Sequence, residues 1–164
     1  MQYNINGVFF SATATTKKVV SQLAHTLAQN YNTKALFYDF TLPKNREKSL
    51  HFTPKDLVIV GVPVYAGRVP NVLLKYLNNQ LKAQNSLAVA VVVYGNRHYD
   101  DALIELKDIL QQNGFNTIAG AAFIGEHSFS KILAKNRPDS QDLKKVEDFA
   151  QEIFNKLKNQ NLKE

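Results

Sequence analysis

The chain has 164 residues, a formal net charge of +6 at pH 7, and 45% hydrophobic and 21% charged residues. This length and composition fit one soluble globular domain, residues 1–164, with a single buried core. The absence of cysteine excludes disulfides, thiolate metal sites and cysteine nucleophiles. The lysines are spread along the chain rather than clustered with aromatic residues, so we expect no binding to nucleic acid.

No targeting or membrane-spanning segment is recognisable in the sequence. Residues 1–6 contain no basic region followed by an apolar stretch, which a signal peptide would have. The longest apolar run, Leu87 to Tyr94, is too short to span a bilayer. We therefore expect a cytoplasmic protein without membrane attachment.

Apolar runs rich in β-branched or aromatic residues alternate with segments of helical spacing. The runs are Gly7–Phe10, Ala35–Tyr38, Leu57–Val62, Leu87–Tyr94 and Thr117–Ile124. Apolar residues at helical spacing lie within 20–31, 72–77, 102–110 and 143–157. This alternation predicts right-handed crossovers and an α/β fold with a parallel sheet covered on both faces. The short run 35–38 is predicted to be an edge strand, and the unbroken runs 57–62 and 87–94 to be central.

Ligands of such sheets bind beyond the carboxyl ends of the strands. That rule selects the loops that follow Phe10, Val62, Tyr94 and Ile124. The chain contains neither the Walker pattern nor GxGxxG, so the usual motifs for binding nucleoside triphosphates and dinucleotides are absent. A receiver domain is also disfavoured, because residues 1–36 contain no carboxylate to hold a divalent cation.

The first loop, residues 11–16 (SATATT), carries four hydroxyl groups and no charge, and it leads into a predicted helix. Free N–H groups and the positive end of the helix dipole attract an anion there, and hydroxyl groups add further donors. A phosphate site is one interpretation. The other is that Thr15 or Thr16 merely caps the helix.

The second and third loops offer flat and aromatic surfaces. Residues 61–70 (GVPVYAGRVP) combine small residues and prolines with the ring of Tyr65, and they could present main-chain groups to a planar heterocycle. Residues 94–101 (YGNRHYDD) follow the most apolar strand, and Tyr99 could stack on a ligand. Alternatively Gly67 only makes a turn, and Asp100 or Asp101 caps a helix. We expect the aspartates to serve the helix and Tyr99 to serve the ligand.

The fourth loop begins Gly125-Glu126-His127-Ser128. A Glu-His pair beside a pocket could perform acid–base chemistry, although such residues also build loops. Together the four loops describe a pocket for a phosphorylated planar cofactor. Flavin mononucleotide (FMN) fits that chemistry.

These motifs resemble the flavodoxin family. Residues 11–16 are similar to its phosphate loop, loosely Ser/Thr-x-Thr-x-Asn/Thr-Thr, and 63–70, 94–102 and 125–128 resemble the flavodoxin-like domain of bacterial flavodoxin–ferredoxin fusion proteins. The resemblance covers nearly the whole chain. It implies a flavodoxin-like three-layer sandwich with a five-stranded parallel sheet of order 2-1-3-4-5 and FMN at the strand ends. A fused ferredoxin is excluded in this sequence, because cysteines are absent.

The resemblance also implies which residues bind the cofactor. Hydroxyls of 11–16 would hold the phosphate, while 63–68 and 94–99 would line the two sides of the ring. The predicted cofactor-binding residues are Ser11, Thr13, Thr15, Thr16, Pro63, Val64, Tyr65, Ala66, Gly67, Arg68, Tyr94, Gly95, Asn96, Arg97, Tyr99 and His127. Alanine stands at positions 12 and 14, where the family commonly has glycine, and it would cost about 1 kcal/mol wherever φ must be positive.

The function predicted from these residues is an FMN-binding redox protein, either an electron carrier or a small reductase with a separate redox partner. In an enzyme, His127 or Tyr99 could pass a proton to a quinone-like acceptor. Cations in the loops, Arg68 and Arg97, would raise the reduction potential. The alternative is a non-catalytic module that has lost or weakened FMN binding. A third hypothesis is a carrier whose basic face docks an acidic partner.

Overall fold

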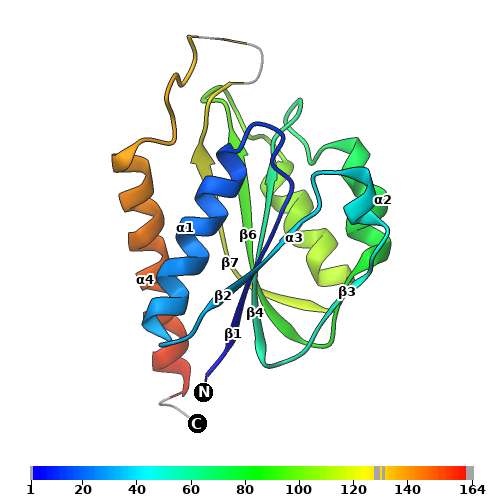
Figure 1. The fold of residues 1–164 in the computed structure, drawn as a ribbon, viewed down its shortest axis with the longest axis vertical. Coiled ribbons are helices and arrows are strands. Elements are labelled where there is room, and N and C mark those ends of the chain that lie inside the picture. Colours follow the sequence, from blue (N-terminus) through cyan, green and yellow to red (C-terminus); the bar gives the residue numbers. More distant parts are fainter. Residues whose placement is uncertain (1, 128–129, 131, 162–164) are drawn as a thin grey trace.

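The structure, a computed structural model, describes residues 2–127, 130 and 132–161. A parallel sheet lies at its centre (Figure 1), in the order β2-β1-β4-β6-β7. Numbered in chain order within this sheet, the order is 2-1-3-4-5, which confirms the predicted topology. Its strands are β1 (Asn4–Phe9), β2 (Ala35–Asp39), β4 (Asp56–Pro63), β6 (Ser86–Tyr94) and β7 (Phe115–Ile124).

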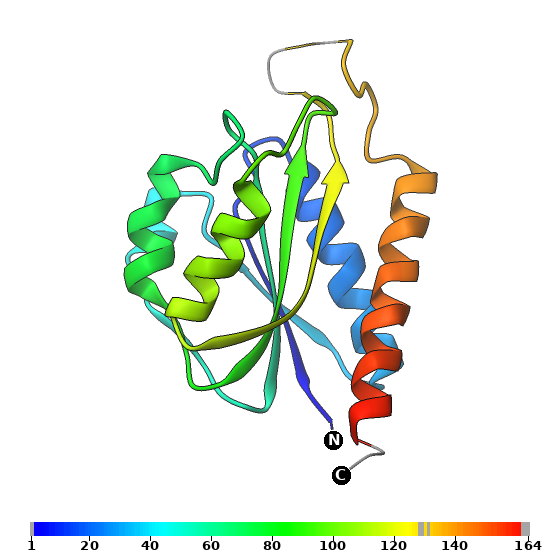
Figure 2. The same cartoon turned by 180° about the vertical axis from the view of Figure 1, so that it is seen from behind.

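Helices cover both faces of the sheet, as Figures 1 and 2 show from opposite sides. The helices α1 (Thr15–Asn30) and α4 (Ser140–Asn161) pack on one face, and α2 (Asn71–Gln80) and α3 (Ala102–Gln112) pack on the other. Each face has its own apolar core, because side chains of a strand alternate between the two sides. The predicted three-layer α/β architecture is confirmed.

Polar residues at the start of β1 explain why the predicted strand was too short. Asn6 is almost fully buried, and its amide donates to Asp56 Oδ1 at 3.2 Å; Asn4 donates to the same oxygen at 3.1 Å. These bonds satisfy polar groups that would otherwise disfavour a buried strand. Hydropathy alone therefore places the start of the strand too late, at Gly7.

Between β2 and β4 the chain forms a short 3-10 helix, η1 (Pro43–Arg46), and a three-residue strand, β3 (Leu50–Phe52). The strand β3 pairs in parallel with β5 (Leu81–Ala83) to form a separate small sheet. The sequence did not predict this sheet, because three residues are too few to show a period and the pairing partners lie about thirty positions apart.

The carboxyl ends of all strands in the main sheet meet at one edge, since the strands are parallel. The loops after β1, β4, β6 and β7 therefore converge there. Among the described residues, no helix is long and apolar enough to cross a membrane.

Candidate functional site

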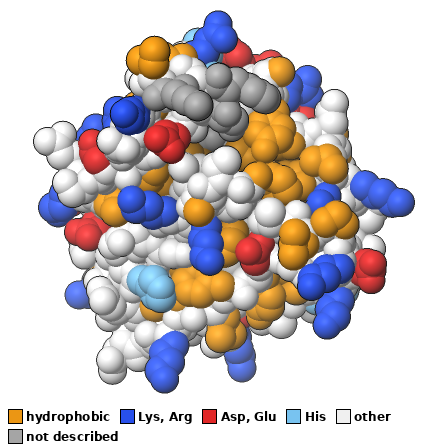
Figure 3. Space-filling view, turned by 45° about the horizontal axis from the view of Figure 1, so that its top comes forward, with side chains coloured by type: hydrophobic (Ala, Val, Ile, Leu, Met, Phe, Trp, Pro, Cys, Tyr) orange, Lys and Arg blue, Asp and Glu red, His pale blue; other side chains and the backbone are white. Residues whose placement is uncertain are grey.

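A cleft of about 670 Å³ opens where the four loops converge. Figure 3 views this edge from above and shows Lys and Arg side chains distributed around it rather than gathered in one patch. The predicted residues that line the cleft are Thr13, Thr15, Thr16, Pro63, Val64, Tyr65, Ala66, Gly67, Tyr94, Gly95, Arg97 and His127. The predicted residues that do not line it, although all are described, are Ser11, Arg68, Asn96 and Tyr99.

The loop between β1 and α1 places hydroxyl groups at the N-terminus of α1. Thr13 and Thr15 lie with their hydroxyl oxygens 3.3 Å apart, and Thr16 is buried at the start of the helix. The first N–H groups of a helix have no partner within it, so this end can receive an anion. The loop therefore offers both side-chain and backbone donors. None of its residues that line the cleft is a cation.

Ser11 does not line the cleft, and its hydroxyl bonds the start of α1. Its hydroxyl oxygen accepts the backbone N–H of Lys17 at 2.9 Å, and its own N–H donates to Thr41 Oγ1 at 2.9 Å. The hydroxyl of Ser11 thus caps the third amide of α1 from outside the helix. The alternative that Thr15 or Thr16 caps the helix was wrong. Ala14 occupies the N-cap position, and its side chain makes no capping hydrogen bond.

Ala14 adopts a left-handed backbone conformation, with φ of 66°. Glycine tolerates this conformation, whereas a residue with a Cβ atom loses roughly 1 kcal/mol. The loop at 11–16 therefore contains the strain that an alanine at position 14 was expected to introduce. Ala12 has no positive φ.

The loop after β4 is a tight two-residue hairpin. Tyr65 and Arg68 exchange backbone hydrogen bonds of 3.0 and 3.1 Å, and Ala66 and Gly67 between them have φ of 50° and 73°. Positive φ at both central positions is the pattern of a type I′ turn. Gly67 is required for space as well, since a Cβ atom there would lie 2.3 Å from Asp100 Oδ2.

Arg68 points away from the cleft, contrary to the expectation that it lies beside the ligand. Its guanidinium donates to both carboxylate oxygens of Glu105 on α3, at 2.8 and 2.9 Å, and Val69 N–H donates to Glu105 at 2.9 Å. The hydrogen bonds from Arg68 hold the pKa of Glu105 below its usual value. Because a bidentate pair with a carboxylate is a strong interaction for an arginine, Arg68 anchors the hairpin to α3.

The loop after β6 forms the opposite wall of the cleft. Tyr94, Gly95 and Arg97 line it as predicted, together with His98 and Asp100, which were not predicted. The carboxylate of Asp100 lies 2.7 Å from His98 Nδ1. The expectation that both aspartates serve α3 was therefore wrong for Asp100, and Asp101 stands at the N-cap position without a side-chain cap bond.

Tyr99 packs edge-on against Tyr94, with ring centroids 5.3 Å apart, and lines a separate groove between α3 and β7. Asn96 has φ of 60° and an exposed side chain outside the cleft. The family resemblance implied that both residues line the ligand, and the aromatic ring of Tyr99 was a further reason. Their side chains leave the cleft because the chain turns sharply between β6 and α3, with left-handed residues at 96 and 100.

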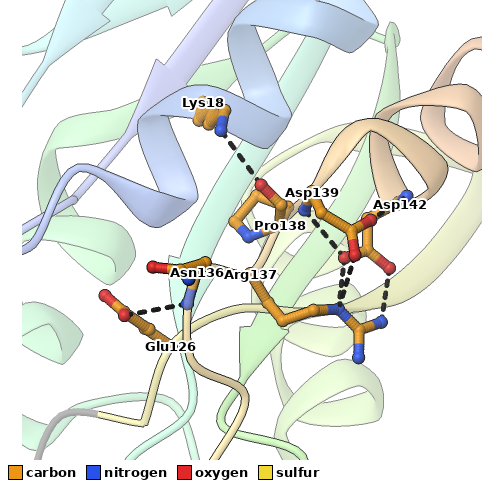
Figure 4. A network of polar contacts seen from close by, with 7 residues as sticks. All are labelled: Lys18, Glu126, Asn136, Arg137, Pro138, Asp139 and Asp142. Carbon is orange, nitrogen blue, oxygen red and sulfur yellow. Dashed lines mark hydrogen bonds and ion pairs between the residues drawn. The ribbon is translucent and has the colours of Figure 1, made fainter. Parts of the chain in front are cut away.

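Polar contacts drawn in Figure 4 fix the segment that leads from β7 into α4. Arg137 donates two bonds of 2.5 Å to Asp142 at the start of α4, and Lys18 Nζ on α1 donates to the carbonyl of Pro138 at 3.0 Å. The hydrogen bonds from Arg137 lower the pKa of Asp142 from 3.8 to about 2. Two helices therefore anchor the far end of this loop.

The near end of the same loop brings Glu126 and His127 to the cleft. Glu126 accepts the N–H of Asn136 at 3.0 Å, so part of its carboxylate serves loop structure, as the simpler interpretation proposed. His127 packs over Gly95, where a Cβ atom would lie 2.6 Å from its ring. Ser128, quoted in the motif, lies outside the described residues.

The lining residues that sequence reasoning missed are Ala12, Val93, His98 and Asp100; Glu126 was named as part of a possible acid–base pair but not as a cofactor-binding residue. All of them stand within or beside the motifs already selected, so only the direction of their side chains was unknown. Among the described residues, no group of three or more His, Asp or Glu side chains could hold a metal ion.

Comparison with known proteins places this chain in a family. The chain is similar in structure to a flavodoxin from the domain Archaea, with 14% identity, TM-score 0.63, and 96% of this chain and 99% of that one covered. It is also similar to the Streptococcus pneumoniae TIGR4 flavodoxin, with 17% identity, TM-score 0.62, and 92% and 97% covered.

A third similar structure is the rubredoxin oxygen:oxidoreductase from Desulfovibrio gigas, with 19% identity and TM-score 0.61; it is matched over 96% of this chain and 37% of that one. At these identities the structural matches show the fold alone. No curated protein sequence matches the chain. The profile of the flavodoxin domain matches residues 8–137, which contain the end of β1, all of β2 to β7 and every loop of the cleft. The chain therefore belongs to the flavodoxin domain family.

Proposed function

We propose that the cleft binds FMN and that the protein is a redox protein, an electron carrier or a small reductase that works with a separate partner. The observation that carries this proposal is the pairing of two different surfaces in one cleft. Thr13, Thr15 and Thr16 offer hydroxyls at a helix N-terminus, and the hairpin at Tyr65 faces the loop at Tyr94. A phosphorylated ligand with a planar ring fits both surfaces at once.

The residues present suit that ligand in size and donor set. A volume of about 670 Å³ lies within the range of cofactor sites, roughly 300–1,000 Å³. Threonine hydroxyls and helix amides would hold the phosphate, and backbone groups of 63–67 and 94–97 would meet the ring edge. When bound, the flavin supplies the electron-transfer chemistry, and the protein supplies placement, electrostatics and limited access of water.

Direct titration tests this proposal. Apoprotein should bind FMN with a micromolar or tighter dissociation constant and quench flavin fluorescence. Riboflavin should bind at least about tenfold more weakly, because it lacks the phosphate. Replacing Thr13 and Thr15 by alanine should remove most of the difference between the two ligands. Thr26→Ala on α1, where the hydroxyl only bonds the carbonyl of Gln22, is the matched control.

One observation favours the alternative of a module with weak or no FMN binding. Ala14 is strained in the loop that would cradle the phosphate, so the cradle is less stable than one with glycine. A folded protein that binds neither FMN nor riboflavin at high concentration would establish this alternative. Equal affinity for the two ligands would contradict the phosphate assignment alone.

A further inference from the structure

The segment that follows β2, residues 40–46, contacts the loop at 11–16 without lining the cleft. It lies there because β1 and β2 are neighbouring parallel strands, so the chain leaves both of them at the same edge of the sheet. Just beyond the two strands, the N–H of Ser11 donates to Thr41 Oγ1 at 2.9 Å. A side chain from outside the cleft therefore holds the first residue of the loop at 11–16.

Ser11 connects this contact to the start of α1. Its hydroxyl oxygen accepts the N–H of Lys17 at 2.9 Å, so the position of Ser11 fixes the third amide of the helix. Within the part of the chain that the structure describes, no acceptor bonds the N–H groups of Thr15 and Thr16, which are the first two of the helix. Through Ser11, Thr41 thus holds the end of the helix whose remaining donors can receive an anion.

Thr41 is itself held by both of its backbone polar groups. Its N–H donates to Asp39 Oδ1 at 2.9 Å, and its carbonyl oxygen accepts Arg46 Nη2 at 3.2 Å. Arg46 also donates from Nη1 to the carbonyl of Val72 at 3.4 Å, and its guanidinium lies 5.9 Å from the centre of the Phe10 ring. Threonine is β-branched and stiff at χ1, so its hydroxyl has little freedom once its backbone is fixed. Contacts outside the cleft therefore fix the acceptor of the Ser11 N–H.

We propose that Thr41 is a positioning residue for the anion end of the cleft, and that it sets how strongly the cleft prefers phosphorylated ligands over unphosphorylated ones. This inference rests on the function proposed above, because it assigns a phosphate to the loop at 11–16. Donors that are already ordered lose less conformational entropy when an anion binds. The hairpin at 65–68 is held separately by Glu105, so Thr41 acts on the phosphate end and not on the ring.

Titration of the full chain with FMN and with riboflavin, which lacks the phosphate, tests the inference. In Thr41→Val the Ser11 N–H loses its acceptor while the side chain keeps its shape, so FMN should bind about fivefold more weakly. The affinity for riboflavin should change by less than about twofold, and Thr41→Ser should restore FMN binding. Thr53→Val is the matched control, because it removes a hydroxyl bond to Asp56 at the opposite end of the sheet. It should leave the ratio of the two affinities unchanged.

Amide hydrogen exchange of the protein without flavin gives a second readout, which does not depend on the proposed function. Exchange of the Lys17 N–H should be about fivefold faster in Thr41→Val than in the wild type, because its acceptor on Ser11 is no longer held. In Thr53→Val it should match the wild type. A wild type that binds neither flavin would contradict the proposed function, and the exchange of Lys17 would then decide the role of Thr41 alone.

Equal weakening of FMN and riboflavin in Thr41→Val would overturn the inference, because it would reveal a general loss of structure. Unchanged FMN affinity or unchanged exchange of Lys17 would overturn it as well. If Thr41→Val fails to fold, Asp39→Ala replaces it, since this change removes the acceptor of the Thr41 N–H. FMN affinity should then fall about two- to threefold while riboflavin affinity stays the same.

Discussion

The two ends of the cleft are built in different ways. The hairpin at 65–68 is tied to its surroundings by its own backbone pair, by the bidentate Arg68–Glu105 contact, and by Asp101 N–H bonding the carbonyl of Gly67 at 3.1 Å. The loop at 11–16 has one capping bond from Ser11 and a strained Ala14. The hairpin is thus braced by several contacts, whereas the first N–H groups of α1 have no partner within the helix.

For the FMN site proposed above, this difference would position the ring rigidly and capture the phosphate by charge. Bracing reduces the entropy that must be lost when a planar ring binds. Unpartnered donors at a helix terminus, in contrast, gain most when an anion replaces water. The substitutions that follow test the two constructions separately.

The largest effect on stability is expected from a substitution in the braced hairpin at 65–68. Gly67→Val places a branched side chain at φ of 73° and against Asp100, so the free energy of unfolding should fall by about 3 kcal/mol. Urea unfolding measures this loss. Gly120→Ala is the control, since its new Cβ atom meets only ordinary contacts and should cost under about 1 kcal/mol. Equal losses in both variants would mean that the turn is not constrained as described.

A smaller loss is expected from releasing the anchored loop after β7. Asp142→Asn removes the charge that pairs with Arg137 and should lower stability by about 2 kcal/mol at pH 7. Asp148→Asn, which alters an exposed pair with Lys144, should cost less than about 0.5 kcal/mol.

The pH dependence of the same variant has a definite sign. The pKa of Asp142 is lowered from 3.8 to about 2, so its stabilisation is present above about pH 4 and is lost as the pH falls toward 2. The wild type should therefore lose more stability than Asp142→Asn over that interval in acid unfolding curves. Parallel curves would show that Asp142 titrates as it does in the unfolded chain.

Relief of backbone strain in the loop at 11–16 should increase stability and FMN affinity. Ala14→Gly should raise stability by up to about 1 kcal/mol and tighten FMN binding, because glycine adopts φ of 66° without penalty. Ala12→Gly is the matched control: φ is not positive there, so the change should be neutral or slightly destabilising. Calorimetry and FMN titration measure both. A gain at position 12 equal to that at position 14 would argue against strain as the cause.

The smallest effect is expected on the reduction potential of bound FMN, from the charge of Arg97. Arg97 lines the cleft and Arg68 does not, so only Arg97→Gln should make the reduction potential of bound FMN more negative, on the order of tens of millivolts. A cation favours the more negatively charged reduced form, and water screens an exposed arginine. Potentiometric titration of both variants provides the comparison, with Arg68→Gln expected to match the wild type.

How much of this site was predictable depends on the kind of information a residue carries. The hydroxyl run at 11–16 and the turn at 66–67 act through local backbone chemistry, so their residue types identify them. The direction of Arg68 depends on Glu105, which is distant in the sequence, while those of Tyr99 and Asp100 depend on how their loop folds, with Tyr99 against Tyr94 and Asp100 against His98. A side chain with several rotamers turns to the best available partner, and that partner is known only after folding.

The amino-acid sequence by itself determined the order of strands and helices, the parallel sheet and the loops that meet at one edge. These properties follow from hydrophobic periods and from the handedness of crossovers, which operate within short segments. The tertiary structure alone decided that Arg68 braces a hairpin against α3 and that β3 pairs with β5. Those outcomes depend on contacts between segments far apart in the chain, and no local period encodes them.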